Sequence, residues 1–218
     1  GISFMIEGKK YVIPVIGKYN VSNALAAIST LRVLGVDDKN MNTLLKDFSS
    51  VQGRMNVLQK EPFMIIVDFA HTPNALKSAL ESASKLKKKN SKIILVFGCA
   101  SKRDDYKRPI MGEYAKKYAD ITILTAEDCR MESLKKINDE IEKGWKEYQT
   151  NEKRQLIRFD DDTHNIKVRR DAIKKAISLA SSGDIVLITG KGHERSLCFG
   201  LKEYEWSDIA EIKKLMRR

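Results

Sequence analysis

Cysteine is scarce in this sequence, and the few cysteines are far apart. The 218 residues contain three, at positions 99, 129 and 198. Disulfide-rich secreted domains carry dense, even-numbered sets of cysteines, and cysteine-based zinc sites need closely spaced pairs. The sequence therefore excludes a disulfide framework and a cysteine metal site, and it indicates a reducing, cytoplasmic environment.

Long apolar runs are absent as well. No stretch approaches the ~20 consecutive apolar residues that a membrane-spanning helix needs. The first residues, Gly1-Ile2-Ser3-Phe4, also lack the basic and apolar segments of a secretory signal. We therefore expect no membrane partner.

Acidic residues are outnumbered by basic ones, 29 against 40, which gives a net charge of +11. Such a balance can indicate a nucleic-acid partner. Many lysines, however, stand in runs such as 85–89, at an expected helix end where they favour the helix dipole and stay hydrated. No helix-turn-helix, RNP-like or zinc-knuckle pattern accompanies them. We expect a small anionic substrate that carries phosphate, and no nucleic acid.

The first 52 residues do not complete a fold of their own. Strands at 2–6 and 11–16 are predicted to form a hairpin, and helices follow at about 21–34 and 41–48. One hairpin and two helices bury too little surface for independent stability. We expect residues 1–52 to be the tail of a preceding domain, and the chain to be part of a longer protein.

From about residue 53 the pattern alternates between strand and helix. Strands are expected near 55–59, 63–67, 92–97, 121–125, 156–159 and 185–189, and helices near 73–88, 109–118, 133–147, 165–181 and 207–216. Alternating strands and helices predict parallel pairing with right-handed crossovers. The expected fold of 53–218 is therefore α/β, with a doubly wound, mostly parallel sheet.

Charged residues follow four of these strands. The apolar runs 63–67, 93–97, 121–124 and 185–188 each lead into a polar loop, and the last loop reads Gly190-Lys191-Gly192-His193-Glu194. The carboxyl ends of parallel strands share one edge of a sheet, where ligands bind in open α/β folds. An ordinary turn with hydrated charges is the alternative for any one loop. The convergence favours a ligand site.

Five motifs, in matching order and spacing, resemble the Mur ligases. They are Gly17-Lys18-Tyr19-Asn20-Val21-Ser22-Asn23-Ala24; Gly53-Arg54; Val67-Asp68-Phe69-Ala70-His71-Thr72-Pro73-Asn74; Phe97-Gly98-Cys99 with Lys102-Arg103-Asp104 and Lys107-Arg108-Pro109; and the Gly190–Glu194 run. The resemblance covers nearly the whole chain. It implies that residues 1–52 end the family's central ATPase domain and that 53–218 are its Rossmann-like C-terminal domain.

The resemblance also implies an activity, a role in peptidoglycan synthesis. ATP converts a carboxylate of a UDP-N-acetylmuramoyl-dipeptide into an acyl phosphate, and the amine of diaminopimelate or lysine attacks it. The resemblance implies ATP and Mg²⁺ as cofactors, because the transferring phosphoryl group needs surrounding cations and family members hold Mg²⁺ for that purpose. No Gly-x-x-x-x-Gly-Lys-Ser/Thr motif occurs in the chain, so we expect the phosphate loop and metal ligands upstream, and no metal site here.

Five residues match the family's nucleotide contacts: Asn20, Asn23, Arg54, Asp68 and His71. The amides suit adenine because they donate and accept at once, although Asn20 could instead cap a helix. Arg54 matches a phosphate contact and Asp68 a ribose contact. His71 could equally be a structural residue that caps the next helix. Arg54 and His71 are the candidates for a catalytic role.

Six residues match the pocket for the incoming amino acid: Arg103, Glu127, Asp128, Arg130, Gly190 and Glu194. A zwitterion needs a guanidinium for its carboxylate and a carboxylate for its ammonium. Diaminopimelate-adding members read Asp-Asn-Pro-Arg where this chain has Glu127-Asp128-Cys129-Arg130. Asp128 is expected to repel a second substrate carboxylate, and the missing proline predicts a looser loop. The identity of the added amino acid therefore stays open.

Two other interpretations remain. A related ligase with another acceptor, of the folylpolyglutamate or cyanophycin type, would share these motifs. A non-catalytic nucleotide-binding module would fit the missing phosphate loop. We expect the protein to be a monomer whose partners are its UDP-muramoyl-peptide and amino-acid substrates.

Overall fold

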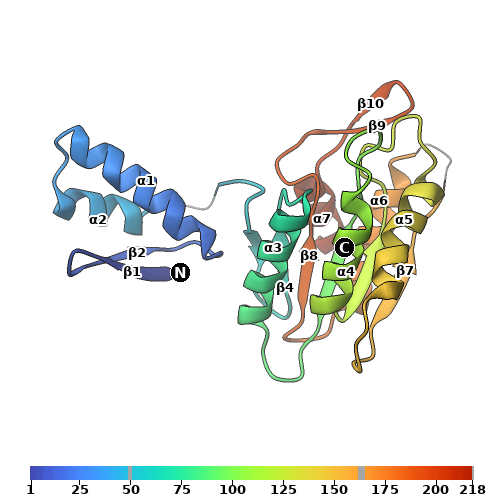
Figure 1. Ribbon diagram of the computed structural model, residues 1–218, viewed down its shortest axis with the longest axis horizontal. Coiled ribbons are helices and arrows are strands. Elements are labelled where there is room, and N and C mark those ends of the chain that lie inside the picture. Colours follow the sequence, from blue (N-terminus) through green and yellow to red (C-terminus); the bar gives the residue numbers. More distant parts are fainter. Residues whose placement is uncertain (49–50, 162–164, 218) are drawn as a thin grey trace. The chain divides into compact units, whose positions relative to one another are not determined.

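The computed structural model describes residues 1–48, 51–161 and 165–217, which divide into two compact units, 1–51 and 52–218. Each unit is described by itself. Both are drawn in Figure 1.

The first unit is a hairpin with two helices. Strands β1 (Ile2–Ile6) and β2 (Lys9–Ile13) pair antiparallel, and helices α1 (Tyr19–Val33) and α2 (Asp38–Lys46) follow. Tyr11, Ile28 and Met41 form its core. The predicted elements are all present, but α2 begins three residues early. Asp37 explains that start, because its carboxylate accepts hydrogen bonds from two backbone N–H groups of the first turn.

The second unit contains a six-stranded sheet. Its strands are β3 (Asn56–Gln59), β4 (Met64–Val67), β5 (Ile93–Phe97), β6 (Ile121–Leu124), β7 (Gln155–Arg158) and β8 (Ile185–Ile188), in the order β3-β4-β8-β5-β6-β7. Every neighbouring pair is parallel except β3 and β4. The predicted mostly parallel sheet is confirmed.

Helices cover both faces of this sheet. They are α3 (Pro73–Leu86), α4 (Lys107–Tyr118), α5 (Leu134–Glu147), α6 (Lys167–Leu179) and α7 (Asp208–Met216). In Figure 1, α3, α4 and α5 lie in front of the sheet and α6 and α7 behind it. Strands β5, β6 and β8 are consequently buried throughout, which explains their uninterrupted apolar sequences. The doubly wound fold is confirmed.

Helices α4 and α5 cross at unusually short distance. A Cβ atom added at Gly144 would lie 1.9 Å from the carbonyl oxygen of Pro109, and one at Gly112 would lie 2.0 Å from that of Ile141. Only glycine fits at either position. This crossing anchors α4, whose first residues follow the loop at the carboxyl end of β5.

A second hairpin was not predicted. Strands β9 (Ser196–Phe199) and β10 (Lys202–Glu205) pair antiparallel just after the glycine-rich loop that ends β8. Arg130, which follows β6, forms a parallel bridge with Phe199. The hairpin therefore extends the carboxyl edge of the sheet.

Candidate active site at the carboxyl edge of the sheet

Asp68 organises the loop after β4. It is 5% exposed, and its two carboxylate oxygens accept backbone N–H groups of Met55 at 2.7 Å and Ala70 at 2.8 Å. Burial raises the pKa of its carboxyl group, while these hydrogen bonds and nearby Arg54 act in the opposite direction. Asp68 thus joins the segment that carries Arg54 to the loop that carries His71.

An aromatic and cationic cluster lies beside Asp68. The Arg54 guanidinium stands 4.6 Å from the centre of the Phe69 ring, and the rings of His71 and His193 lie 4.5 and 4.9 Å from it. His71 Nδ1 lies 3.0 Å from the carbonyl oxygen of Phe69. That carbonyl can only accept, so Nδ1 carries the proton and a neutral ring leaves Nε2 as an acceptor.

The structure brings three predicted nucleotide residues together: Arg54, Asp68 and His71. His71 does not cap α3, because the cap is Thr72, whose hydroxyl accepts from Ala75 N. Sequence reasoning did not select Phe69 or His193 for this cluster. Their aromatic character and their places beside Asp68 and in the glycine-rich loop were the available signals.

Lys191 lies between two acids on the other side of β8. Its side chain is 1% exposed, and its Nζ forms ion pairs with Asp128 at 2.9 Å and Glu194 at 2.6 Å. Asp128 Oδ1 also accepts from Cys198 N at 2.9 Å. The expected charge of Asp128 is therefore met by a buried cation, which weakens the predicted repulsion of a second substrate carboxylate.

Glu127 is buried behind this ion-pair group. It is 6% exposed, and a Cβ atom added at Gly190 would lie 2.8 Å from its Oε2, an atom with no hydrogen-bond partner among the described residues. Loss of hydration raises the pKa of Glu127 to about 7, although Lys107, Arg169 and Lys191 favour its charged form. The glycine lets the loop after β8 pass directly over this acid.

Arg130 is held by the β9–β10 hairpin. Its backbone N–H donates to Cys198 O at 3.2 Å, and its carbonyl accepts from Gly200 N at 2.7 Å. With Ser101 N donating to Asp128 O, these bonds fix the loop on both sides. These backbone hydrogen bonds hold the loop where the family's proline is missing, and the looser loop stays a prediction. The Arg130 side chain is 45% exposed and lies 3.7 Å from Glu203.

The remaining predicted residues are Arg103, Asn20 and Asn23. Arg103 is exposed on the loop after β5. Asn20 and Asn23 belong to the first unit, where the Asn20 amide donates to Ile16 O and the Asn23 amide to Asn20 Oδ1. Asn20 does not cap α1, since the cap position is Lys18.

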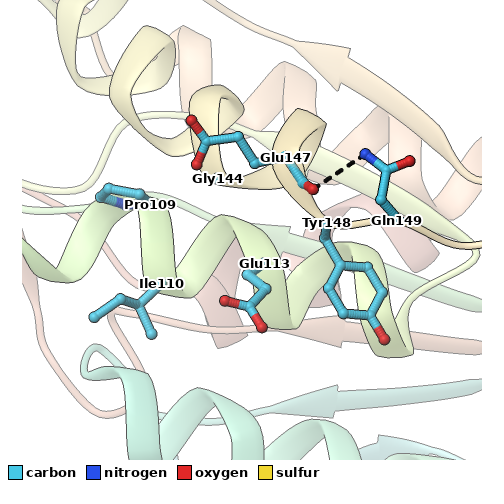
Figure 2. Close-up of a pocket in the computed structure, with 7 residues that line it drawn as sticks. All are labelled: Pro109, Ile110, Glu113, Gly144, Glu147, Tyr148 and Gln149. Carbon is cyan, nitrogen blue, oxygen red and sulfur yellow. Dashed lines mark hydrogen bonds between the residues drawn. The ribbon is translucent and has the colours of Figure 1, made fainter.

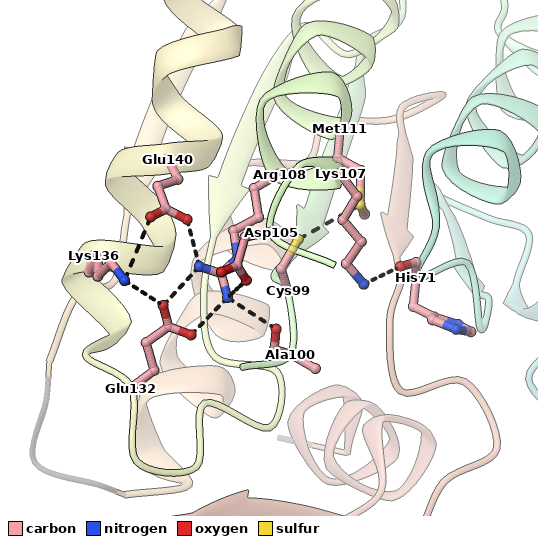
Figure 3. A network of polar contacts seen from close by, with 10 residues as sticks. All are labelled: His71, Cys99, Ala100, Asp105, Lys107, Arg108, Met111, Glu132, Lys136 and Glu140. Atoms are coloured by element: carbon pink, nitrogen blue, oxygen red, sulfur yellow. Dashed lines mark hydrogen bonds and ion pairs between the residues drawn. The ribbon is translucent and has the colours of Figure 1, made fainter. Parts of the chain in front are cut away.

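A buried polar network, drawn in Figure 3, ties the loops of this edge to helices α4 and α5. Arg108 is fully buried and donates to Glu132, to Glu140 and to the carbonyl oxygen of Ala100. Its neighbour Lys107 is 5% exposed and donates from Nζ to the backbone oxygen of His71 at 2.8 Å. Lys107 and Arg108 thus fix loop positions.

Arg169 gives similar support from the opposite face. It is fully buried, pairs with Asp208 through two hydrogen bonds, and donates to Ala126 O and Thr189 O. Those carbonyl groups follow β6 and β8. One side chain on α6 therefore fixes the two strand ends that carry Asp128 and Lys191.

A hollow of about 390 Å³ lies elsewhere, between α4 and α5, and is drawn in Figure 2. It is lined by Pro109, Ile110, Glu113, Gly144, Glu147, Tyr148 and Gln149. None of the predicted site residues lines it.

The described residues contain neither a candidate membrane span nor a candidate metal site. Outside positions 49–50, 162–164 and 218, no helix is long and apolar enough to cross a membrane, and no group of three or more His, Cys, Asp or Glu side chains could hold a metal ion.

Comparison with known proteins places the chain in a family. The profile described as "Mur ligase, glutamate ligase domain" matches residues 53–192. A UDP-N-acetylmuramoyl-L-alanyl-D-glutamate–2,6-diaminopimelate ligase of Aquifex aeolicus is 38% identical over 96% of this chain and 41% of its own length. One of Prochlorococcus marinus is 36% identical over 97% of this chain and 40% of its own. The chain thus spans about two fifths of these relatives.

Solved structures agree. One described as a ligase of the same name superposes with a TM-score of 0.68 at 29% identity, covering 96% of this chain and 40% of that one. A structure of "E.coli FolC in complex with ADP" gives a TM-score of 0.64 at 17% identity, which shows a shared fold alone. The profile match, the sequence relatives and the doubly wound fold agree: this chain belongs to the Mur ligase family.

Proposed function

We propose that this chain is part of an ATP-dependent ligase that adds 2,6-diaminopimelate to a UDP-N-acetylmuramoyl-dipeptide. The observation that carries the proposal is the group formed by Arg130, Asp128, Lys191 and Glu194 at the carboxyl edge of the sheet. It presents a guanidinium and carboxylates on adjoining loops. A zwitterionic amino acid needs both.

The relatives favour diaminopimelate over lysine. Diaminopimelate carries a second carboxylate, which Arg130 would bind with its guanidinium. The ion pair between Lys191 and Asp128 removes the charge that would oppose that carboxylate. Glu194, 38% exposed at its side chain, would accept from an ammonium of the substrate.

Nucleotide would bind on the β4 side of the same edge. Arg54 is exposed and stacked on Phe69, so it would contact phosphate without breaking an internal ion pair. The lone pairs that remain on Asp68 would accept from ribose hydroxyls. His71 would present Nε2 toward the nucleotide. In the ligase reaction these residues bind and orient ATP next to the amino acid, so that the reacting groups meet in a fixed geometry.

Magnesium is expected of such an enzyme, and the described residues of this chain contain no group of three or more His, Cys, Asp or Glu side chains that could hold a metal ion. We assign no metal ligand here. The folylpolyglutamate alternative has the support of fold alone.

The test is amino-acid-dependent ADP release by the complete native protein that contains this chain. It is supplied with ATP and UDP-N-acetylmuramoyl-L-alanyl-D-glutamate, and with diaminopimelate, lysine or ornithine in turn. We expect release with diaminopimelate, and a tripeptide product by mass spectrometry. Release only with lysine or ornithine would overturn the proposed substrate. No release with any of the three amino acids would overturn the proposed function.

A further inference from the structure

Lys191 is almost fully buried and yet connects two acids that reach solvent. Its side chain is 1% exposed, whereas those of Asp128 and Glu194 are 20% and 38% exposed. Its Nζ lies 2.9 Å from Asp128 Oδ1 and 2.6 Å from Glu194 Oε2. The cation therefore stands behind the acids and cannot itself reach a ligand beyond them.

The two acids belong to different loops. Asp128 follows β6 and Glu194 follows β8, and β5 lies between these strands in the sheet. Apart from Lys191, no described side chain forms an ion pair with Asp128 or Glu194. Removing the cation would leave two carboxylates close together and partly desolvated, which is costly and would push the loops apart.

Acidic side chains lie close to Arg130. Glu203 lies 3.7 Å from its guanidinium, and Asp128 is two residues away in the same loop. Buried Glu127, Lys107 and Arg169 lie behind this loop. If Asp128 lost its cation, two acids would compete for Arg130 with any carboxylate of a ligand.

We propose that Lys191 is a positioning residue of the amino-acid pocket and a determinant of its preference for a second carboxylate. It holds Glu194 in place for the substrate ammonium, and it neutralises Asp128 so that Arg130 can bind the distal carboxylate. This inference rests on the proposed function.

The test uses Lys191→Met, which keeps most of the side-chain volume and removes the charge, in the complete native protein. Diaminopimelate is compared with lysine, which lacks only the distal carboxylate, as substrate or as competitive inhibitor. We expect the KM for diaminopimelate, or its inhibition constant as a competitor, to rise at least about tenfold. The corresponding KM or inhibition constant for lysine should rise less, and the KM for ATP should stay within about twofold of the wild-type value.

A second variant separates charge from structure. In Asp128→Asn/Lys191→Met the uncompensated carboxylate is gone, so part of the loss for diaminopimelate should be recovered. Lys174→Met, at an exposed position of α6, is the matched control and should change nothing. If Lys191→Met fails to fold, the constants for diaminopimelate, lysine and ATP are compared between the double variant and Asp128→Asn.

Several results would overturn the inference. Equal losses for diaminopimelate, lysine and ATP would show a general structural role, as would no recovery in the double variant. If Lys191→Met left the constants for diaminopimelate, lysine and ATP unchanged, Lys191 would have no role in the amino-acid pocket. An inactive wild-type protein would instead contradict the proposed function, so the two failures are distinguishable.

Discussion

At the scale of single residues, Glu127 shows how burial at the carboxyl edge of the sheet changes the pKa of a carboxyl group. Burial raises its pKa from the ordinary value of 4.5 to about 7, because nearby Lys107, Arg169 and Lys191 only partly replace lost hydration. Its partner-free Oε2 packs over Gly190. Between pH 4.5 and 7 the folded protein therefore keeps a proton that the unfolded chain has released.

Stability should consequently fall as pH rises through this window, by at most about 1.4 kcal/mol per pH unit from this group. Glu127→Gln removes this titrating carboxyl group and, with it, its contribution to the pH dependence of stability. The difference in unfolding free energy between Glu127→Gln and wild type should increase from pH 4.5 to 7 and then level off, as measured by urea denaturation. Parallel curves for the two proteins would contradict the prediction.

Glu132→Gln is the control for this titration. Its hydrogen bonds with Arg108 hold the pKa of Glu132 down to about 2. The charged Glu132 carboxylate stabilises the protein above pH 4.5, and this contribution is lost as the pH falls from 4.5 towards 2, outside the window tested for Glu127. It should leave the slope between pH 4.5 and 7 unchanged.

The sequence allowed the charged residues of the edge to be found, but not their pairing. Asp128 was expected to act as an open charge, and Lys191 was noted in the glycine-rich loop but not counted among the residues of the amino-acid pocket. The ion pair joins positions 63 residues apart, so no local pattern indicates it. In the same way, Lys107 and Arg108 are basic residues of a loop motif whose burial becomes visible only with α3, α5 and the loop before α5 in place.

At the scale of secondary-structure elements, the α4–α5 crossing is the most constrained contact described. Alanine normally stabilises a helix over glycine by ~1 kcal/mol. At Gly144 the sign should reverse, because the new Cβ would lie 1.9 Å from the carbonyl oxygen of Pro109. We expect Gly144→Ala to destabilise the protein by about 1–3 kcal/mol, measured as a lower midpoint in denaturant.

Lys143→Ala tests the neighbouring exposed position of the same helix. It should change stability by at most about 0.5 kcal/mol. A stabilised Gly144→Ala would show that the two helices can separate without cost.

Strands β4, β5, β6 and β8 were predictable because they read as unbroken or nearly unbroken apolar runs, as buried parallel strands do. The β9–β10 hairpin was not. Its four-residue strands, Ser196–Phe199 and Lys202–Glu205, carry no such run, and pairing with Arg130 across the sheet edge stabilises them. That hairpin fixes the backbone of Arg130, so the pocket depends on an element that sequence pattern did not reveal.

At the scale of the whole molecule, the sequence predicted that four strand ends would meet at one edge, and the strand order confirms it. The division of that edge between ATP and an amino acid stays a prediction. The 218-residue chain alone should have no ligase activity, because it contains no Gly-x-x-x-x-Gly-Lys-Ser/Thr phosphate loop. Tripeptide formed from ATP and both substrates by this chain alone would contradict that expectation.

The most direct test of the divided edge is a crossed pair of variants in the complete native protein, Arg54→Ala and Arg130→Ala. Both side chains are exposed or half-exposed, so neither change should disturb the core. Each removes a charge-assisted hydrogen bond of about 1.5–3 kcal/mol, or roughly one to two powers of ten.

The measurement is the KM for ATP and for diaminopimelate in each variant. We predict that Arg54→Ala raises the KM for ATP about tenfold or more while leaving that for diaminopimelate nearly unchanged, and that Arg130→Ala does the reverse. If both constants rise together in both variants, the carboxyl edge does not contain two separate binding groups, and the account of this site is wrong.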